Sequence, residues 1–164
     1  MRHNILIIED DRDMREYIAD VLGLANYSVI KAESSKLGIE LAKHHCPDLI
    51  LCGITLPEFN GYQVIDILSK DPETAAIPFI FLIGEAENID IRKGIEMGAV
   101  DYLVQPFYTT RLLKAIENCL HKKAREKSYY GKSFKNISDL VPQERDLEHF
   151  DGLKELEKLG KTYS

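Results

Sequence analysis

Three acidic residues, Glu9, Asp10 and Asp11, directly follow a short apolar run over residues 5–8. Neighbouring carboxylates supply the oxygen ligands that Mg²⁺ prefers. The residues that follow two later apolar runs are Gly53 and Gln105, and neither carries a carboxylate or a base. We therefore expect either a residual, weak Mg²⁺ site at Glu9 and Asp10 or a solvated acidic pocket without function.

Two kinds of segment alternate along the chain, and they determine where these residues lie in the fold. Five short apolar runs are typical of strands buried on both faces: Ile5–Ile8, Tyr27–Ile30, Leu49–Cys52, Phe79–Ile83 and Tyr102–Val104. Five further stretches have helical spacing: Asp13–Leu24, Ser35–His45, Tyr62–Ser69, Glu87–Met97 and Thr109–Leu120. The alternation predicts an α/β fold with a doubly wound parallel sheet. Sites in such sheets lie at the carboxyl ends of the strands.

The order and spacing of these segments resemble the receiver domain of bacterial response regulators over residues 1–121. The segments that carry the resemblance are Ile5–Asp11, Pro47–Pro57, Asn60-Gly61, Phe79–Leu82, Gly94–Leu103 and Pro106-Phe107. The resemblance implies a flavodoxin-like sheet in strand order 2-1-3-4-5 and a cis peptide bond before Pro106. It also implies two-component signalling, with a histidine kinase, another signalling protein or a second copy of the chain as partner.

The sequence departs from the family at three of five functional positions. The cation-binding acidic pair is present as Glu9 and Asp10, but Gly53 stands at the phosphoacceptor position. Ile83 replaces the hydroxyl residue and Gln105 replaces the lysine. We interpret the chain as a natural pseudo-receiver, rather than one engineered at Gly53, because three groups are lost together. We expect a phosphorylation-independent scaffold with no enzymatic activity and no required cofactor. Phosphoryl transfer to a substitute, Asp11 or Thr55, is the alternative.

The resemblance also indicates a switch pair and an output surface. The switch pair would be Ile83 and Tyr102, and the β-branch of Ile83 restricts its rotation. We expect a frozen switch with Tyr102 exposed, while a half-buried strand position for Tyr102 stays open. The partner-binding face would contain Ile91, Val100, Tyr102, Tyr108 and Arg111. These residues form either an apolar contact patch or scattered surface hydrophobes.

Charge divides the 164-residue chain, whose net charge is −6, into an acidic part and a mildly basic tail. We predict a receiver-like domain over residues 1–121 and an extension over 122–164 that contains a linker and short helices. Nucleic-acid binding through the basic linker is a further alternative. No apolar run approaches the roughly 18–20 residues that span a membrane. The three cysteines read as reduced thiols of a cytoplasmic protein, and His44, His45 and Cys46 do not share one helix face.

Overall fold

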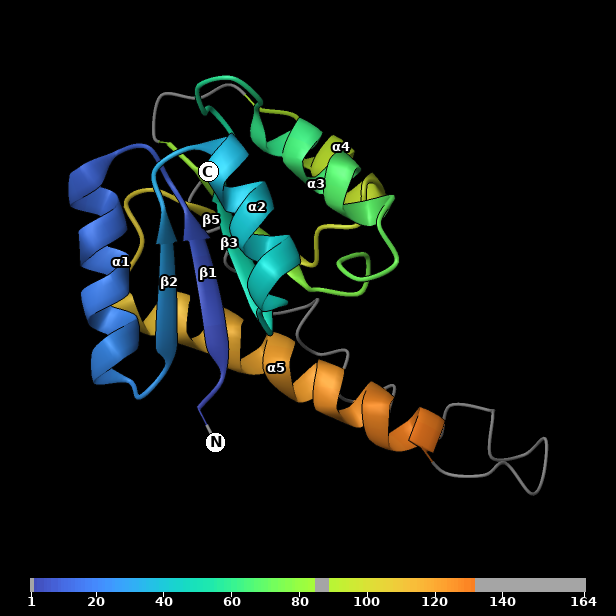
Figure 1. Ribbon diagram of the computed structural model, residues 1–164. Helices are drawn as coiled ribbons and strands as arrows, with labels where there is room; N and C mark the ends of the chain where they lie inside the picture. Colours follow the sequence, from blue (N-terminus) through green and yellow to red (C-terminus); the bar gives the residue numbers. More distant parts are fainter. Residues whose placement is uncertain (1, 85–88, 132–164) are drawn as a thin grey trace. The chain divides into compact units, whose positions relative to one another are not determined.

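Five strands and five helices alternate along the chain in the computed structural model, which describes residues 2–84 and 89–131 (Figure 1). The strands are β1 (Asn4–Ile8), β2 (Ser28–Ala32), β3 (Leu49–Gly53), β4 (Phe79–Ile83) and β5 (Asp101–Val104). The helices are α1 (Arg12–Leu24), α2 (Ser35–His45), α3 (Gly61–Ser69), α4 (Ile91–Glu96) and α5 (Thr109–Gly131). The predicted alternation of strands and helices is confirmed.

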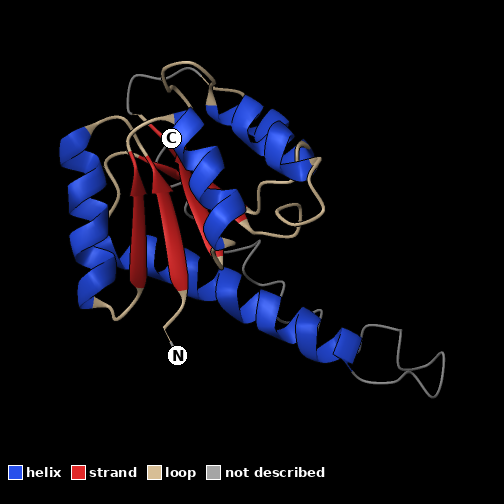
Figure 2. Ribbon diagram, in the orientation of Figure 1, coloured by secondary structure: helices blue, strands red, loops and turns tan. Residues whose placement is uncertain are grey.

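The strands form one parallel sheet in the order β2-β1-β3-β4-β5. Gly53 lies opposite Leu82, and Ile83 lies opposite Val104. The strands run through the middle of the domain with helices on both sides (Figure 2). This arrangement confirms the doubly wound, flavodoxin-like fold, and it brings the carboxyl ends of all strands to one edge of the sheet.

Each strand contributes side chains to two apolar cores. One core combines Ile8, Phe81 and Ile83 with residues of α2 and α3. The other combines alternate strand residues such as Ile7 and Leu82 with residues of α1 and α5. Because both faces of the sheet are covered, its strands read as continuous apolar runs rather than as an alternation.

Polar residues set where the helices begin. Asp11 accepts a hydrogen bond from the Met14 amide at the start of α1, and Ser34 accepts one from the Leu37 amide at the start of α2. Such caps satisfy backbone donors that have no partner within the helix. Asp90 caps α4, which therefore begins at Ile91. The predicted start at Glu87 was too early, although residues 85–88 themselves lie outside the described part.

Helix α5 continues to Gly131, beyond the helical stretch predicted over Thr109–Leu120. The chain divides into two compact units, Met1–Arg125 and Glu126–Ser164. The short helices expected in the extension lie outside the described residues. Within those residues, no helix combines the length and the apolar character needed to cross a membrane.

Candidate functional site

Glu9 and Gly53 meet at the carboxyl edge of the sheet. Glu9 directly follows β1, and its amide donates to the Ala32 carbonyl, which extends the pairing with β2 by one residue (3.0 Å). Gly53 is the last residue of β3, rather than the first residue after it as the sequence pattern suggested. Both residues are buried, and Glu9 is only 9% exposed.

The Glu9 carboxylate occupies the space beside the Gly53 α-carbon. A β-carbon added to Gly53 would collide with Glu9 Oε2 and would lie 3.4 Å from a methyl carbon of Leu56. The carboxylate of Glu9, which follows β1, therefore already fills the space in which an acceptor side chain at position 53 would begin.

The remaining acidic residues of this edge have defined contacts. The Arg15 guanidinium donates to the backbone carbonyl oxygens of Glu9 (2.8 Å) and Asp10 (3.5 Å). The Asp11 side chain caps α1 through the Met14 amide (3.1 Å). Asp11 therefore has a structural role at the position where the sequence allowed a substitute phosphoacceptor.

Cys52 is the residue before Gly53 in β3 and is fully buried. Burial raises the pKa of the Cys52 thiol well above its ordinary value, and the charge of Glu9 raises it further. The thiol is consequently neutral. The Glu9 carboxylate thus influences the core as well as the site.

At the ends of β4 and β5 the described residues include Ile83 and Gln105, and neither side chain is charged. Ile83 is 4% exposed. Its carbonyl accepts a hydrogen bond from the backbone amide of half-buried Gln105 (2.8 Å). The peptide bond between Gln105 and Pro106 is cis, as the resemblance implies. Tyr102 is half-buried and packs against the core that contains Ile83. The expectation of an exposed Tyr102 is therefore wrong, and the half-buried alternative holds.

Exposed apolar side chains lie on α4, beside and within β5 and just before α5. We call the region that carries them the α4–β5 surface. Its exposed members include the predicted Ile91 (36%), Val100 (44%) and Tyr108 (72%). Ile95 (47% exposed) and Val104 (45% exposed) lie here too, although the sequence pattern did not single them out. Ile95 stands four residues after Ile91, so the helical spacing could have revealed it.

Arg111 does not project freely from this surface. Its guanidinium forms an ion pair with Asp101 (3.3 Å) and donates to the Tyr102 carbonyl (3.3 Å). The side chains of Arg111 and Asp101 are only 24% and 15% exposed. The pair links β5 to α5 within one chain.

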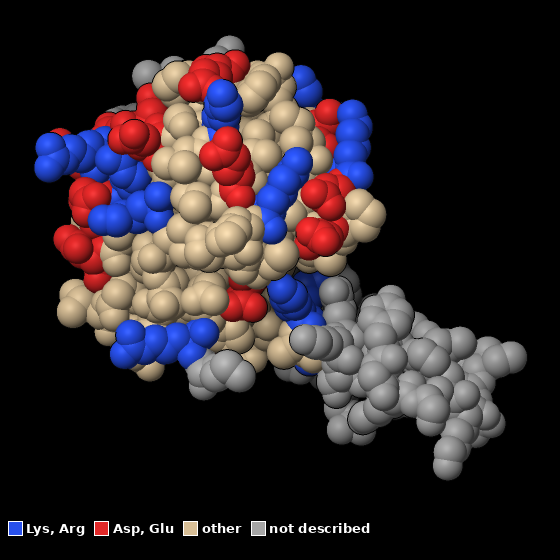
Figure 3. All heavy atoms as spheres, in the orientation of Figure 1, with Lys and Arg blue, Asp and Glu red and all other residues tan. Residues whose placement is uncertain are grey.

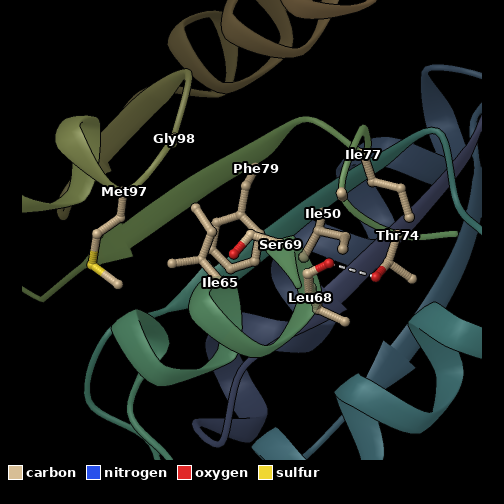
Figure 4. A pocket seen from close by; sticks show the side chains of 10 residues that line it. Ile50, Ile65, Leu68, Ser69, Thr74, Ile77, Phe79, Met97 and Gly98 are labelled. Carbon is tan, nitrogen blue, oxygen red and sulfur yellow. Dashed lines mark hydrogen bonds between the residues drawn. The ribbon is translucent and has the colours of Figure 1, made fainter. Parts of the chain in front are cut away.

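A small cavity lies at the opposite end of the sheet from Glu9. Its lining includes Leu68, Phe79 and Met97, and Thr74 donates to the Leu68 carbonyl beside it (2.7 Å; Figure 4). Its volume is about 60 Å³. Ligand pockets usually enclose roughly 300–1,000 Å³, so this cavity is too small for a cofactor.

These features define a receiver-like α/β protein, and comparison with known proteins identifies the family. Residues 5–117 match the response regulator receiver domain, and the chain belongs to that family. It is 36% identical over 116 residues to protein PilH of Pseudomonas aeruginosa, covering 71% of this chain and 96% of PilH. It is 33% identical over 122 residues to the chemotaxis protein CheY of Bacillus subtilis, covering 74% of this chain and all of CheY (100%).

Other relatives are much longer. The match covers 92% of this chain but only 11% of a histidine kinase P4 from Formosa agariphila, at 29% identity. It covers 27% of a probable cyclic di-GMP phosphodiesterase from Vibrio cholerae. A crystal structure of a CheY-like receiver domain protein from Methanospirillum hungatei has the same fold, with a TM-score of 0.71 at 23% identity over 77% of this chain and 99% of that one.

Receiver domains typically bind Mg²⁺, so the donor set of this chain can be tested against that cation. Asp11 caps α1, so Glu9 and Asp10 are the carboxylates considered for a cation at this edge, and the Glu9 carboxylate lies against Gly53. Within residues 2–84 and 89–131, no three His, Cys, Asp or Glu side chains are grouped to hold a metal. Mg²⁺ requires near-octahedral oxygen coordination. The donors present do not fit the family's cation.

Proposed function

We propose that this chain is a pseudo-receiver, which signals through protein contacts and does not accept a phosphoryl group. The observation that carries the proposal is Gly53 at the end of β3, with the Glu9 carboxylate in the adjacent space. Glycine has no side chain that could form a phosphoryl bond. The domain accordingly has no phosphotransfer activity and needs no cofactor.

The surroundings of Gly53 support the same proposal. Phosphoryl transfer depends on positioned groups that neutralise the charge of the transferred phosphoryl. Ile83 and Gln105 supply no cation and no hydroxyl at the ends of β4 and β5. Arg15 is the cationic group next to the acidic pair, but it is bound to backbone carbonyls from the side of α1.

Helix α4 is held in place by contacts that involve no phosphoryl group. The Tyr62 hydroxyl donates to the Asp90 carbonyl at the start of α4 (3.1 Å). The Lys93 ammonium lies 4.8 Å from the centre of the Tyr62 ring, within the range of a cation–π interaction. Gly94 lets the helix approach the Phe81 ring. These contacts support a fixed presentation of α4 to a partner.

The α4–β5 surface is the site at which we expect the partner to bind. The surface exposes apolar side chains beside charged residues of α4 such as Arg92 and Glu96, and exposed apolar groups often mark interaction sites. Asp101 is already paired with Arg111 of the same chain. The surface thus favours an apolar contact over an interface of ion pairs between chains. The partner is a histidine kinase, another signalling protein or a second copy, met in the bacterial cytoplasm.

Phosphoryl acceptance can be tested directly. The chain is incubated with acetyl phosphate and Mg²⁺, and its intact mass is measured. We expect no mass increase. A gain of one phosphoryl group, mapped to any residue, would overturn the proposal and favour a substitute acceptor such as exposed Thr55.

The contact surface has its own test. Partners are captured from an extract of the organism that encodes the chain, using the wild-type chain and an Ile95→Asp variant. The matched control is Leu24→Asp, because Leu24 is 91% exposed on α1, away from the α4–β5 surface. We expect the partner to be lost with Ile95→Asp and kept with Leu24→Asp. Equal recovery with all three chains would contradict the assignment of the surface.

A further inference from the structure

A second surface lies at the amino end of the sheet, opposite the Glu9 site, and Asp48 connects its parts. The Asp48 carboxylate accepts from the Asn4 amide (2.7 Å) and lies 3.7 Å from a ring nitrogen of His3. The Asp48 carbonyl accepts from Lys123 of α5 (3.5 Å). The start of β1, the start of β3 and the later part of α5 therefore meet here, with the end of α2 only a few residues before Asp48. Figure 1 shows these segments together at the end of the domain marked by the N-terminus.

The segments that meet at this end carry five bases, which define what we call the amino-end surface. They are Arg2, Lys43, Lys122, Lys123 and Arg125. All but Lys123 are exposed. All four histidines of residues 1–125 also lie here, namely His3, His44, His45 and His121. In Figure 3 the lower edge of the described part carries basic groups on both sides of an acidic one.

Charge is strongly segregated between this surface and the rest of the domain. Residues 1–125 contain 14 Lys and Arg and 19 Asp and Glu. The amino-end surface holds five of these bases. Two acids pair with its histidines, Asp48 with His3 and Glu117 with His121. The remainder of the domain is therefore distinctly acidic.

Helix stability explains only part of this arrangement. Lys43, His44 and His45 stand in the last turn of α2, where cations interact favourably with the helix dipole. Arg2 precedes β1, and Lys122 and Arg125 lie nine and six residues before the end of α5, outside its last turn. The helix dipole gives no reason for these three bases to share one surface with the end of α2.

We propose that the amino-end surface binds an acidic segment of a partner protein. A cluster of exposed cations attracts carboxylates and steers their approach. A long nucleic-acid duplex would extend beyond the cluster over the acidic remainder of the domain. Its phosphates would be repelled there, because charges still interact over about 10 Å in moderate salt. A short acidic peptide can be confined to the cluster and does not meet this difficulty.

The proposal is tested with the full chain and a fluorescein-labelled oligoglutamate peptide, using fluorescence anisotropy. We expect saturable binding that weakens by about tenfold or more between about 50 and 200 mM salt. The triple variant Lys43→Glu, Lys122→Glu, Arg125→Glu should weaken binding by a similar factor. The control triple is Arg12→Glu, Lys36→Glu, Lys70→Glu, which makes the same change in net charge at exposed positions elsewhere. Thermal unfolding checks that both variants remain folded.

Two outcomes would overturn the proposal. Equal loss of peptide binding in the two triple variants would mean that net charge alone attracts the peptide. Tighter binding of an oligothymidylate of the same length, or of vesicles rich in phosphatidylserine, would assign the surface to nucleic acid or to a membrane instead. Because none of these measurements involves the α4–β5 surface, their failure would leave the proposed function unaffected.

Discussion

The Glu9 carboxylate lies against the α-carbon of Gly53, in the space where any other residue at position 53 would place its β-carbon. Glu9 directly follows β1, and Gly53 ends the neighbouring strand β3. Glu9 Oε2 is the end of a flexible side chain, so it can move aside if the space is needed. Residue 53 therefore determines where the Glu9 carboxylate lies, and with it the number of carboxylates available to a cation.

The first prediction concerns Gly53→Asp. Its β-carbon should displace Glu9 and bring three carboxylates to one edge of the sheet. Without a cation, repulsion among them should lower the stability by about 1 kcal/mol. Added Mg²⁺ should reverse this loss, because a ligand at about 100 times its Kd stabilises a folded protein by about 2.7 kcal/mol. Thermal unfolding against Mg²⁺ concentration measures both effects.

Gly53→Ala is the control for this experiment. It introduces the same β-carbon and displaces Glu9, but it adds no carboxylate. Its unfolding temperature should respond to Mg²⁺ no more than that of the wild type. If Mg²⁺ stabilised the wild-type chain as strongly as Gly53→Asp, then Glu9 and Asp10 would be a sufficient cation site and the conclusion about the donor set would be wrong.

The sequence was sufficient to predict the fold because five buried strands and five amphipathic segments alternate in it. It also placed Glu9 and Gly53 at the same sheet edge. It did not predict that Glu9 fills the space beside Gly53. That contact depends on the side-chain conformation of Glu9 and joins residues 44 positions apart in the sequence. Likewise, the pairing of Arg111 with Asp101 depends on how α5 packs beside β5. The resemblance placed Arg111 on the partner-binding face, and the structure has it in a half-buried ion pair with Asp101.

The second prediction concerns the close approach of α4 to the sheet. A β-carbon on Gly94 would lie 2.8 Å from a ring carbon of Phe81, which is buried in the core. Gly94→Ala should therefore destabilise the domain by about 1–3 kcal/mol. The matched control is Gly23→Ala in α1, where nothing lies within 4 Å of the added carbon. This control should be neutral or stabilising by up to about 1 kcal/mol. Urea unfolding measures both, and equal effects would contradict the role of Gly94.

The third prediction concerns the Tyr62 hydroxyl. Tyr62→Phe removes the hydrogen bond to the Asp90 carbonyl but keeps the ring against Phe81 and below Lys93. A hydrogen bond of this kind contributes about 1 kcal/mol, which corresponds to a roughly fivefold change in a local opening equilibrium. Amide exchange in α4 should accelerate by that factor, while exchange in α2 should be unchanged. Uniform acceleration throughout the domain would indicate a global loss of stability instead of a local contact with α4.

The last prediction concerns the pH dependence that Cys52 introduces. Its pKa is raised in the folded state, first by burial and then by the charge of Glu9. The folded chain consequently holds this proton at pH values where the unfolded chain has lost it. The contribution to stability is complete below the unfolded pKa of about 8.5 and decreases as the pH rises above it. Cys52→Ala should remove this part of the alkaline loss of stability, measured by urea unfolding between neutral and alkaline pH. Tyr27, whose pKa is also raised, should leave a remaining decrease at higher pH. If the slopes for Cys52→Ala and the wild type were identical from neutral pH upward, the buried thiol would not be titrating with unfolding.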